Sequence, residues 1–298
     1  MLFCFLRMRL SPPLTKKHDG ETMLNTLRDI LDFRRLPTIT VANRSLLWQF
    51  VKRSVSARYR GSMLGLFWSF AQPLMMLCVY TFVFSVVFKA RWGVDTEGGR
   101  GAFAIIMFCG LALFNIFSEA VNLNCGIVVG NTNLVKKVIF PLEILPLSQT
   151  IASFAVGMVW FFLLFLGSVF IFGKLSFTML LLPLILLPLF LFTLGVSFFT
   201  SSLGVYVRDT PHIVGVVLQI LFFVTPIFYP VSAIPERFRW PILMNPLTLL
   251  IEEARKVFLY GELPDWRFLG AAFLISLLVL HLGFLWFHKT KKGFADVL

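Results

Sequence analysis

Charge is scarce in this sequence, and it is absent from five long stretches. Only 14% of the 298 residues are charged, against roughly 25% in a soluble domain. With His taken as neutral, the charge-free stretches are residues 61–88, 144–173, 175–207, 210–235 and 268–288. A sixth stretch, 101–135, contains one charged residue, Glu119. Because about 20 apolar residues suffice for a helix to cross a bilayer, the sequence predicts an all-α polytopic membrane protein with six transmembrane helices.

The sequence also lacks the motifs of common catalytic and nucleotide-binding sites. It contains no Gly-Lys-Ser or Gly-Lys-Thr, no His-Glu-x-x-His and no Gly-x-Ser-x-Gly. Its four His and four Cys residues show neither metal-ligand spacing nor a Cys-x-x-Cys pair. The chain is therefore expected not to be an enzyme and to hold no cofactor or metal. A secondary transporter would show repeated halves with ionisable residues at mid-membrane, so a transporter driven by a separate energy source fits better.

The basic residues indicate the topology. Six crossings place both termini on one side of the membrane, and 18 of the 27 Lys and Arg residues then lie on that side. Positive residues favour the cytoplasmic side, so both termini are expected in the cytoplasm. The net charge of +12 is interpreted as this topology signal, together with attraction to anionic lipid, and not as a nucleic-acid site.

These patterns divide the chain into four parts. We expect a cytoplasmic leader without a signal peptide at 1–43, an amphipathic interface helix at 44–60, a six-span transmembrane domain at 61–288 and a cytoplasmic tail at 289–298. The expected spans are about 66–88, 102–122, 144–172, 176–205, 212–230 and 268–288.

Residues 44–60 are amphipathic when drawn on a helical wheel. One half carries Leu46, Leu47, Trp48, Phe50, Val51 and Val55. The other half carries Lys52, Arg53 and Arg60. A helix of this kind beside a membrane span lies in the interface plane, with its basic side chains towards the headgroups. It is expected to serve either as an anchor or as a docking surface for a cytoplasmic partner.

Polar residues recur on one face of the second expected span. Asn115, Glu119 and Asn122 follow helical spacing. A carboxylate inside a span is costly unless it meets water or a partner. This face therefore predicts a hydrated path or a helix interface, and the alternative is that Glu119 snorkels at the cytoplasmic boundary. The third expected span begins with a second polar cluster, which we expect to share a cavity with the first. Its members are Ser148, Gln149, Thr150 and Ser153.

Two further segments interrupt the transmembrane pattern. Residues 131–143 mix Lys136 and Lys137 with bulky apolar side chains, which predicts a short amphipathic cytoplasmic helix whose apolar surface needs a partner. Residues 226–261 begin with a Pro-Ile-Phe-Tyr-Pro break and contain an apolar stretch too short to span the membrane. We expect re-entrant helices there, acting either as a gate or as a rigid outer cap.

Five short motifs follow one another within residues 44–261. They are Arg58-Tyr-Arg-Gly-Ser-Met-Leu-Gly-Leu-Phe-Trp68 with Gln72-Pro73, Asn131-x-Asn-Leu-Val-Lys-Lys-Val-Ile-Phe-Pro141, Arg208-Asp209, Pro226-Ile-Phe-Tyr-Pro230 and Asn245-Pro246. Each is weak alone, but the ordered set resembles the membrane (permease) subunits of polysaccharide and O-antigen ABC exporters. The resemblance implies a homodimer in the cytoplasmic (inner) membrane that pairs with two copies of a separate ATPase subunit, which binds ATP and Mg. The expected substrate is a lipid-linked polysaccharide of the O-antigen, capsule or teichoic-acid type.

The resemblance also assigns roles to the residues singled out above. Coupling to the ATPase is expected of Arg58, Tyr59, Arg60, Asn131, Asn133, Leu134, Val135, Lys136, Lys137, Phe140, Pro141, Glu143, Arg208 and Asp209. The transport path is expected at Trp68, Tyr80, Asn115, Glu119, Asn122 and Gln149. The gate is expected at Pro226, Tyr229, Pro230, Asn245, Pro246, Glu252 and Arg255. The alternatives are an ABC exporter permease for drugs or small lipids, and a passive membrane channel or scaffold that forms no complex with a nucleotide-binding protein.

Overall fold

The computed structural model describes residues 35–87, 99–136, 140–173 and 177–298, and all regular structure in these residues is helical. By its internal contacts the chain divides into two units, Met1–Val41 and Ala42–Leu298. The described residues of the first unit belong to α3 (Arg35–Ala42), where the Thr40 hydroxyl donates to the carbonyl of Leu36 at 2.8 Å. Lys137 of the coupling motif lies outside the described residues.

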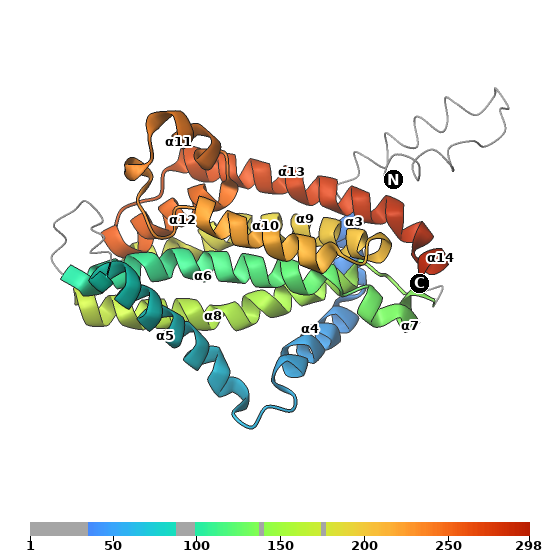
Figure 1. Ribbon diagram of the computed structural model, residues 1–298. Helices are drawn as coiled ribbons and strands as arrows, with labels where there is room; N and C mark the ends of the chain where they lie inside the picture. Colours follow the sequence, from blue (N-terminus) through green and yellow to red (C-terminus); the bar gives the residue numbers. More distant parts are fainter. Residues whose placement is uncertain (1–34, 88–98, 137–139, 174–176) are drawn as a thin grey trace. The chain divides into compact units, whose positions relative to one another are not determined.

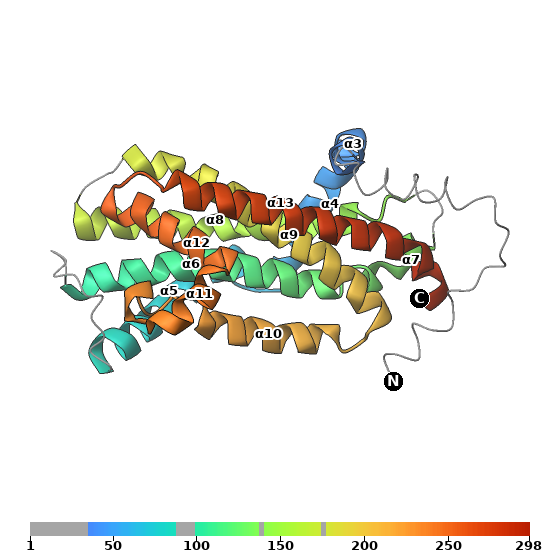
Figure 2. The ribbon, with the colours of Figure 1, turned by 90° about the horizontal axis from the view of Figure 1, so that it is seen from above.

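The second unit is a bundle of long helices joined by short ones (Figure 1). The longer helices are α4 (Arg44–Tyr59), α5 (Trp68–Thr81), α6 (Gly99–Cys125), α8 (Ile144–Phe172), α9 (Leu182–Tyr206), α10 (Thr210–Val224) and α13 (Trp266–Thr290). The shorter ones are α7 (Thr132–Val135), α11 (Glu236–Leu243), α12 (Pro246–Arg255) and α14 (Phe294–Val297). Single turns lie at η1 (Gly65–Phe67), η3 (Val129–Asn131), η4 (Phe177–Leu181), η5 (Val231–Ala233) and η7 (Lys291–Gly293), and π-helical turns extend α5 at η2 (Phe82–Val87) and α12 at η6 (Lys256–Tyr260). Figures 1 and 2 show α7 and α14 at the same end of this unit.

Four helices among the described residues are long and apolar enough to cross a membrane. They are Gly101–Cys125, Ile144–Ile171, Phe177–Tyr206 and Trp266–Val297. The predicted all-helical membrane class is therefore confirmed. α5 and α10 coincide with two more expected spans, but α10 ends at Val224 and not at residue 230, because Thr225 has an extended backbone and precedes a proline. The count of six crossings stays a prediction.

Helix α6 occupies the centre of the second unit. In its apolar stretch 83% of the residues are buried inside the chain, against 28–33% in the other three long apolar helices. α8, α9, α10 and α12 all contact α6. The polar residues of α6 therefore face other helices or the cavities between them.

Helices α9 and α13 make the most extensive contact of the unit, and two glycines bring their backbones together. A Cβ atom on Gly283 would lie 2.0 Å from the carbonyl oxygen of Gly195, and one on Gly195 would lie 2.6 Å from the backbone of Val279 and Leu280. Lipid tails are as apolar as leucine, so helices associate in a membrane through such close packing. No side chain larger than hydrogen fits at this crossing.

We expect Gly283→Ala to lower the free energy of unfolding by about 1–3 kcal/mol, because the obstructing atom belongs to the backbone and cannot turn aside. Gly270→Ala on the same helix is the matched control, since a Cβ there meets nothing within 4 Å. Helix propensity should make the control neutral or stabilising by up to about 1 kcal/mol. Titration with SDS in mixed micelles measures both values. Equal losses for the two variants would refute the close approach.

Candidate functional site

Helix α4 packs against α8 through its apolar side. Leu47 and Val51 are buried, whereas Lys52, Arg53 and Arg60 are exposed. The amphipathic pattern read from the sequence thus agrees with the structure at these positions, whereas Trp48 of the expected apolar half is 57% exposed. The last turn of α4 also reaches the next helix, because the Tyr59 hydroxyl shares a short hydrogen bond with Ser69 of α5.

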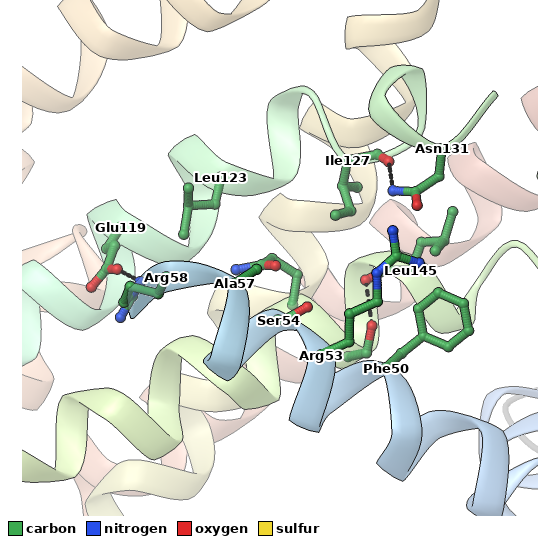
Figure 3. Close-up of a pocket in the computed structure, with 12 residues that line it drawn as sticks. Phe50, Arg53, Ser54, Ala57, Arg58, Glu119, Leu123, Ile127, Asn131 and Leu145 are labelled. Carbon is green, nitrogen blue, oxygen red and sulfur yellow. Dashed lines mark hydrogen bonds and ion pairs between the residues drawn. The ribbon is translucent and has the colours of Figure 1, made fainter. Parts of the chain in front are cut away.

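The end of α4 is tied to the centre of the bundle by an ion pair. Arg58 of α4 contacts the carboxylate of Glu119 on α6, and the two side chains are 23% and 37% exposed (Figure 3). Burial lowers the pKa of the Arg58 guanidinium from its ordinary value. Glu119 therefore has a specific partner, as its position in an apolar helix requires.

A cavity of about 400 Å³ lies beside this ion pair, between α4, α6 and the start of α8 (Figure 3). We call it the α4–α6–α8 cavity. Its polar lining comes from Arg53, Ser54, Arg58, Glu119, Asn131, Ser148 and Gln149. Its apolar lining includes Phe50, Leu123, Ile127 and Leu145. As the sequence predicted, Ser148 and Gln149 share a cavity with Glu119, whereas Thr150 and Ser153 of the same cluster do not line it.

Two further cavities also reach Glu119. One, of about 420 Å³, is lined by Tyr80, Asn115 and Asn122. The other, of about 400 Å³, is lined by Trp68, Asn115 and Arg58. Glu119 lines both of them as well as the α4–α6–α8 cavity. The structure thus brings all the residues expected in the transport path to cavities that meet at one carboxylate, while their role in transport stays a prediction.

The described part of the segment expected to form a coupling helix contains one short α-helix. α7 comprises only Thr132–Val135, and Asn131 precedes it without capping it, because its side-chain amide donates backwards to the Ile127 carbonyl at 2.8 Å. Asn133 and Lys136 are exposed, whereas Val135 is buried.

Phe140, further along the segment, packs against α4. Its ring lies 5.6 Å, centroid to centroid, from that of Phe50. The apolar side chains of the segment are therefore partly covered by the chain itself. Among the described residues of the segment, 131–136 and 140–143, the exposed ones are Asn133 and Lys136.

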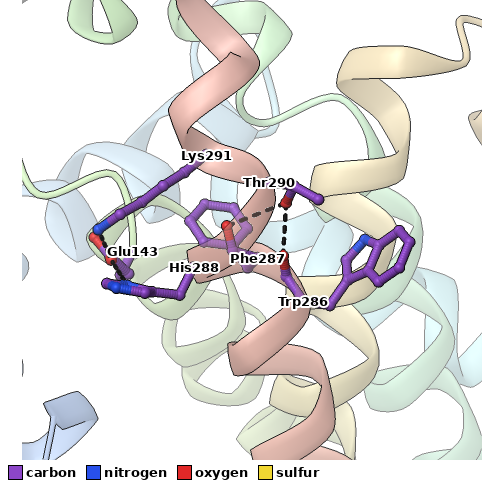
Figure 4. A network of polar contacts seen from close by, with 6 residues as sticks. All are labelled: Glu143, Trp286, Phe287, His288, Thr290 and Lys291. Carbon is purple, nitrogen blue, oxygen red and sulfur yellow. Dashed lines mark hydrogen bonds and ion pairs between the residues drawn. The ribbon is translucent and has the colours of Figure 1, made fainter. Parts of the chain in front are cut away.

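Glu143, which the sequence grouped with the partner-facing residues, is buried and bonds to the end of the last long helix. Its carboxylate is 2% exposed and accepts from Lys291, with His288 Nδ1 3.3 Å from the same oxygen (Figure 4). Burial opposes its ionisation, but hydrogen bonds with His288 and Lys291 outweigh burial and lower the pKa of Glu143 to about 2. The carboxylate is therefore enclosed by the chain itself, and a coupling role of Glu143 stays a prediction.

The remaining residues expected at the partner face lie at turns. Arg60 is the exposed residue that ends α4, and Arg208 and Asp209 are exposed in the turn between α9 and α10. Pro141 is half-buried two residues before Glu143. These positions are open to a partner, and their role stays a prediction.

The segment expected to form the gate converges on one buried arginine. The Arg255 guanidinium donates to the carbonyls of Pro226 and Ile227 at 2.8 Å each and to the Ile106 carbonyl of α6 at 3.3 Å. It also pairs with Glu252 at 2.7 Å. A Cβ on Gly110 would lie 3.0 Å from this guanidinium, so the glycine makes room for it. We call these contacts the Arg255 network.

Other side chains of this segment hold its turns. The Asn245 amide donates to the Thr225 hydroxyl at 3.1 Å, and its carbonyl oxygen caps α12, which begins at Pro246, by accepting from Leu247 N at 3.0 Å. The Tyr229 hydroxyl bonds to the end of α10, at the Phe223 and Val224 carbonyls. Pro230 follows as the half-buried start of η5.

Several structurally important residues were not found from the sequence. His288 and Lys291, which bond to Glu143, were assigned no contact from the sequence. The Asn124 amide donates to the Thr150 hydroxyl at 3.1 Å and links α6 to α8. Glu253, which is 3% exposed, pairs with Lys256 at 2.7 Å and accepts from Asp265 N at 2.6 Å.

The long apolar helices and the polar cavities between them define an integral membrane protein of the α-helical bundle class. Within that class, the chain belongs to the ABC-2 type transporter family, which matches residues 45–259. The matched range contains α4, the three cavities around Glu119, α7 and the Arg255 network.

Among curated proteins, the chain is similar to permeases of polysaccharide export. It is 30% identical over 260 residues to the O-antigen export system permease protein RfbA of Myxococcus xanthus, and 27% identical over 256 residues to RfbA of Klebsiella pneumoniae. Each match covers 85% of this chain and 95% of the relative. The polysialic acid transport protein KpsM of Escherichia coli is 22% identical over 80% of this chain and 91% of its own length. The resemblance read from the motifs is therefore confirmed.

Proposed function

We propose that this chain is the channel-forming transmembrane subunit of an ATP-driven exporter that moves lipid-linked polysaccharide across the cytoplasmic membrane. The observation that carries the proposal is the match to O-antigen export permeases over 85% of the chain. In this proposal the chain crosses the membrane six times with both termini in the cytoplasm, and works as a homodimer. Its partner is a separate ATPase subunit, present in two copies, that holds ATP and Mg.

In this proposal the chain supplies the transport path and a separate subunit supplies the ATPase. The sequence has no Gly-Lys-Ser or Gly-Lys-Thr motif, so the energy of ATP has to arrive from another protein. The transport subunit is proposed to receive it at exposed residues around α7, chiefly Asn133 and Lys136. A docked ATPase that changes shape on binding ATP would then favour one of two arrangements of the permease dimer.

The segment that contains α7 lies beside α4, and α4 in turn contacts the polar face of α6. A cavity of about 350 Å³ separates α7 from Arg53 of α4, and Phe140 packs on Phe50 of the same helix. At its other end α4 carries Arg58, which pairs with Glu119. In this proposal, movement of the α7 segment reaches α4 through Phe140 and Phe50 and reaches α6 through the Arg58–Glu119 ion pair.

The tagged chain should retain an ATPase subunit after gentle extraction in detergent, and Lys136→Glu should reduce the bound ATPase activity at least tenfold. The substitution replaces a positive charge by a negative one on the exposed surface that is proposed to dock. Arg237→Glu is the matched control, because Arg237 is also an exposed basic residue but lies on α11, in the expected gate segment. The control should retain the partner and its activity.

Two outcomes would contradict the proposal. Absence of any nucleotide-binding protein from the purified complex would favour a passive channel or scaffold. Equal loss of the ATPase with both charge reversals would show that α7 is not the docking surface. Size-exclusion profiles of the two variants establish that each is folded before the comparison is made.

A further inference from the structure

Two buried carboxylates hold helix α13, one at each of its ends. At the C-terminal end Glu143, which is 2% exposed, accepts from Lys291, and His288 Nδ1 lies 3.3 Å from the same oxygen (Figure 4). At the N-terminal end Glu253 of α12, which is 3% exposed, accepts from the backbone N–H of Asp265 at 2.6 Å. Burying a carboxylate is costly unless it is bonded, so both contacts are specific attachments.

The two carboxylates belong to the two segments that interrupt the transmembrane pattern. Glu143 ends residues 131–143, which we call the coupling segment, and Glu253 lies in residues 226–261, which we call the gate segment. Figures 1 and 2 show α12 beside one end of α13, with α7 and α14 at the other. Arg255 of α12 joins this helix to the turn after α10. Helix α13 therefore connects the coupling segment to the gate segment.

Helix α13 and its neighbour α9 are fastened to each other at two levels. A Cβ on Gly283 would lie 2.0 Å from the carbonyl oxygen of Gly195. Near the C-terminal end, the Ser202 hydroxyl bonds to the Thr290 hydroxyl and the Tyr206 hydroxyl donates to the Thr290 carbonyl, each at 2.7 Å. We therefore expect the two helices to move as one unit.

A helix of this length transmits small displacements along its axis. α13 has 25 residues, about 37 Å at 1.5 Å per residue, and its backbone hydrogen bonds resist stretching. An axial shift of about 1 Å at one end is more than an N–H···O hydrogen bond at the other end tolerates. Displacement of Glu143 should therefore reach the bond between Asp265 and Glu253.

We infer that Glu143 and Glu253 are positioning residues for transport, because they attach α13 to the coupling segment and to the gate segment. Through them, α13 carries movement of the coupling segment to the gate segment. The inference rests on the proposed function, which supplies the ATPase that moves the coupling segment. The route differs from the one through Arg58 and Glu119, since it involves neither α4 nor α6.

The first test uses the full chain alone in nanodiscs, with hydrogen–deuterium exchange as the readout. Lys291→Met keeps the length of the side chain but removes the bond to Glu143, so the Asp265 amide at the far end of α13 should exchange about threefold faster or more. Lys291→Arg keeps the charge and should restore the wild-type rate. Lys292→Met is the matched control, because Lys292 is the exposed next residue and lies outside the Glu143 contacts.

Two outcomes of this test would overturn the inference. One is an Asp265 amide whose exchange is unchanged by Lys291→Met. The other is equal acceleration at η1, which lies at the start of α5 and outside the route, because the whole fold would then have loosened.

The second test uses the complex with the ATPase and a non-hydrolysable ATP analogue, which should change exchange in both segments of the wild type. Lys291→Met should retain the ATPase and the response of the coupling segment, but reduce the response of the gate segment about threefold or more. Glu253→Gln should give the same pattern from the other end. The double variant should reduce the response no further than the stronger single variant, because both interrupt one route.

The second test contradicts the inference in three cases. Multiplied effects in the double variant would mean that the two carboxylates act separately. Loss of the response in the coupling segment itself would assign Glu143 to docking. Loss of the gate response in Arg58→Gln, with a normal response in Lys291→Met, would assign the movement to α6. The first test needs no ATPase, so failure of this route and failure of the proposed exporter complex are observed separately.

Discussion

We expect Arg255→Met to lower the free energy of unfolding by about 3–5 kcal/mol, the largest effect of any substitution considered for this chain. Arg255 is 1% exposed and satisfies the carbonyls of Ile106, Pro226 and Ile227. Methionine fills similar space but donates no hydrogen bond, so these oxygens lose the donor that the guanidinium supplied. Buried polar atoms without partners are costly because no water replaces the lost donor.

Arg239→Met is the control for Arg255→Met. Arg239 also donates to two backbone carbonyls, those of Ile234 at 2.8 Å and Ser232 at 3.0 Å, but it is only half-buried. Water can replace it, so a loss of about 1–2 kcal/mol is expected. SDS titration in mixed micelles gives both values. A loss for Arg255→Met no larger than that for Arg239→Met would mean that the Arg255 network does not hold the segment after α10.

The second large effect is expected for Glu143→Gln, at about 3 kcal/mol near neutral pH. In the folded chain the pKa of Glu143 is lowered from 4.5 to about 2, and one pKa unit corresponds to about 1.4 kcal/mol. Glutamine keeps the shape of the side chain but not its charge. The electrostatic stabilisation that Lys291 and His288 give to the charged carboxylate is therefore lost, while the packing of the side chain is preserved.

The pH dependence of stability distinguishes this ion pair from simple packing. Because the pKa in the folded chain lies below the ordinary value, the unfolded chain binds more protons between these two values. The stabilisation is therefore complete above about pH 4.5 and is lost as the pH falls towards about 2. Wild type should lose stability relative to Glu143→Gln across this window. Glu262→Gln, at an exposed carboxylate, should follow wild type throughout, and a parallel pH profile for Glu143→Gln would count against the network.

Much of the fold could be predicted from where charge is missing. Each of the charge-free stretches contains or coincides with one helix, α5, α8, α9, α10 or α13, and the ends of α8 and α13 agree within two residues, because a bilayer favours helices in such segments. The end of α10 was placed too late, since apolarity continues through the Thr225-Pro226 break although the helix does not. Hydropathy reports where a segment lies and not where its hydrogen bonds stop.

Part of the candidate site could be predicted from the spacing of polar residues along one helix. Helical spacing placed Asn115, Glu119 and Asn122 on one face, and the structure opens that face onto cavities. The partners could not be predicted, because the contacts of Arg58 with Glu119 and of Lys291 with Glu143 join residues far apart in the chain. The same holds for Gly195 and Gly283, whose approach depends on how α9 crosses α13.

Helix α6 has a mechanical consequence for the whole unit. Near one end Glu119 pairs with Arg58, and nearer the other the Ile106 carbonyl accepts from Arg255. Thirteen residues separate these two positions, a lever arm of about 20 Å on a stiff helix. A tilt of about 5° around Glu119 would move Ile106 by about 2 Å, more than a hydrogen bond tolerates. α6 cannot tilt by this amount while both the ion pair and the hydrogen bond persist, so one of them has to break first.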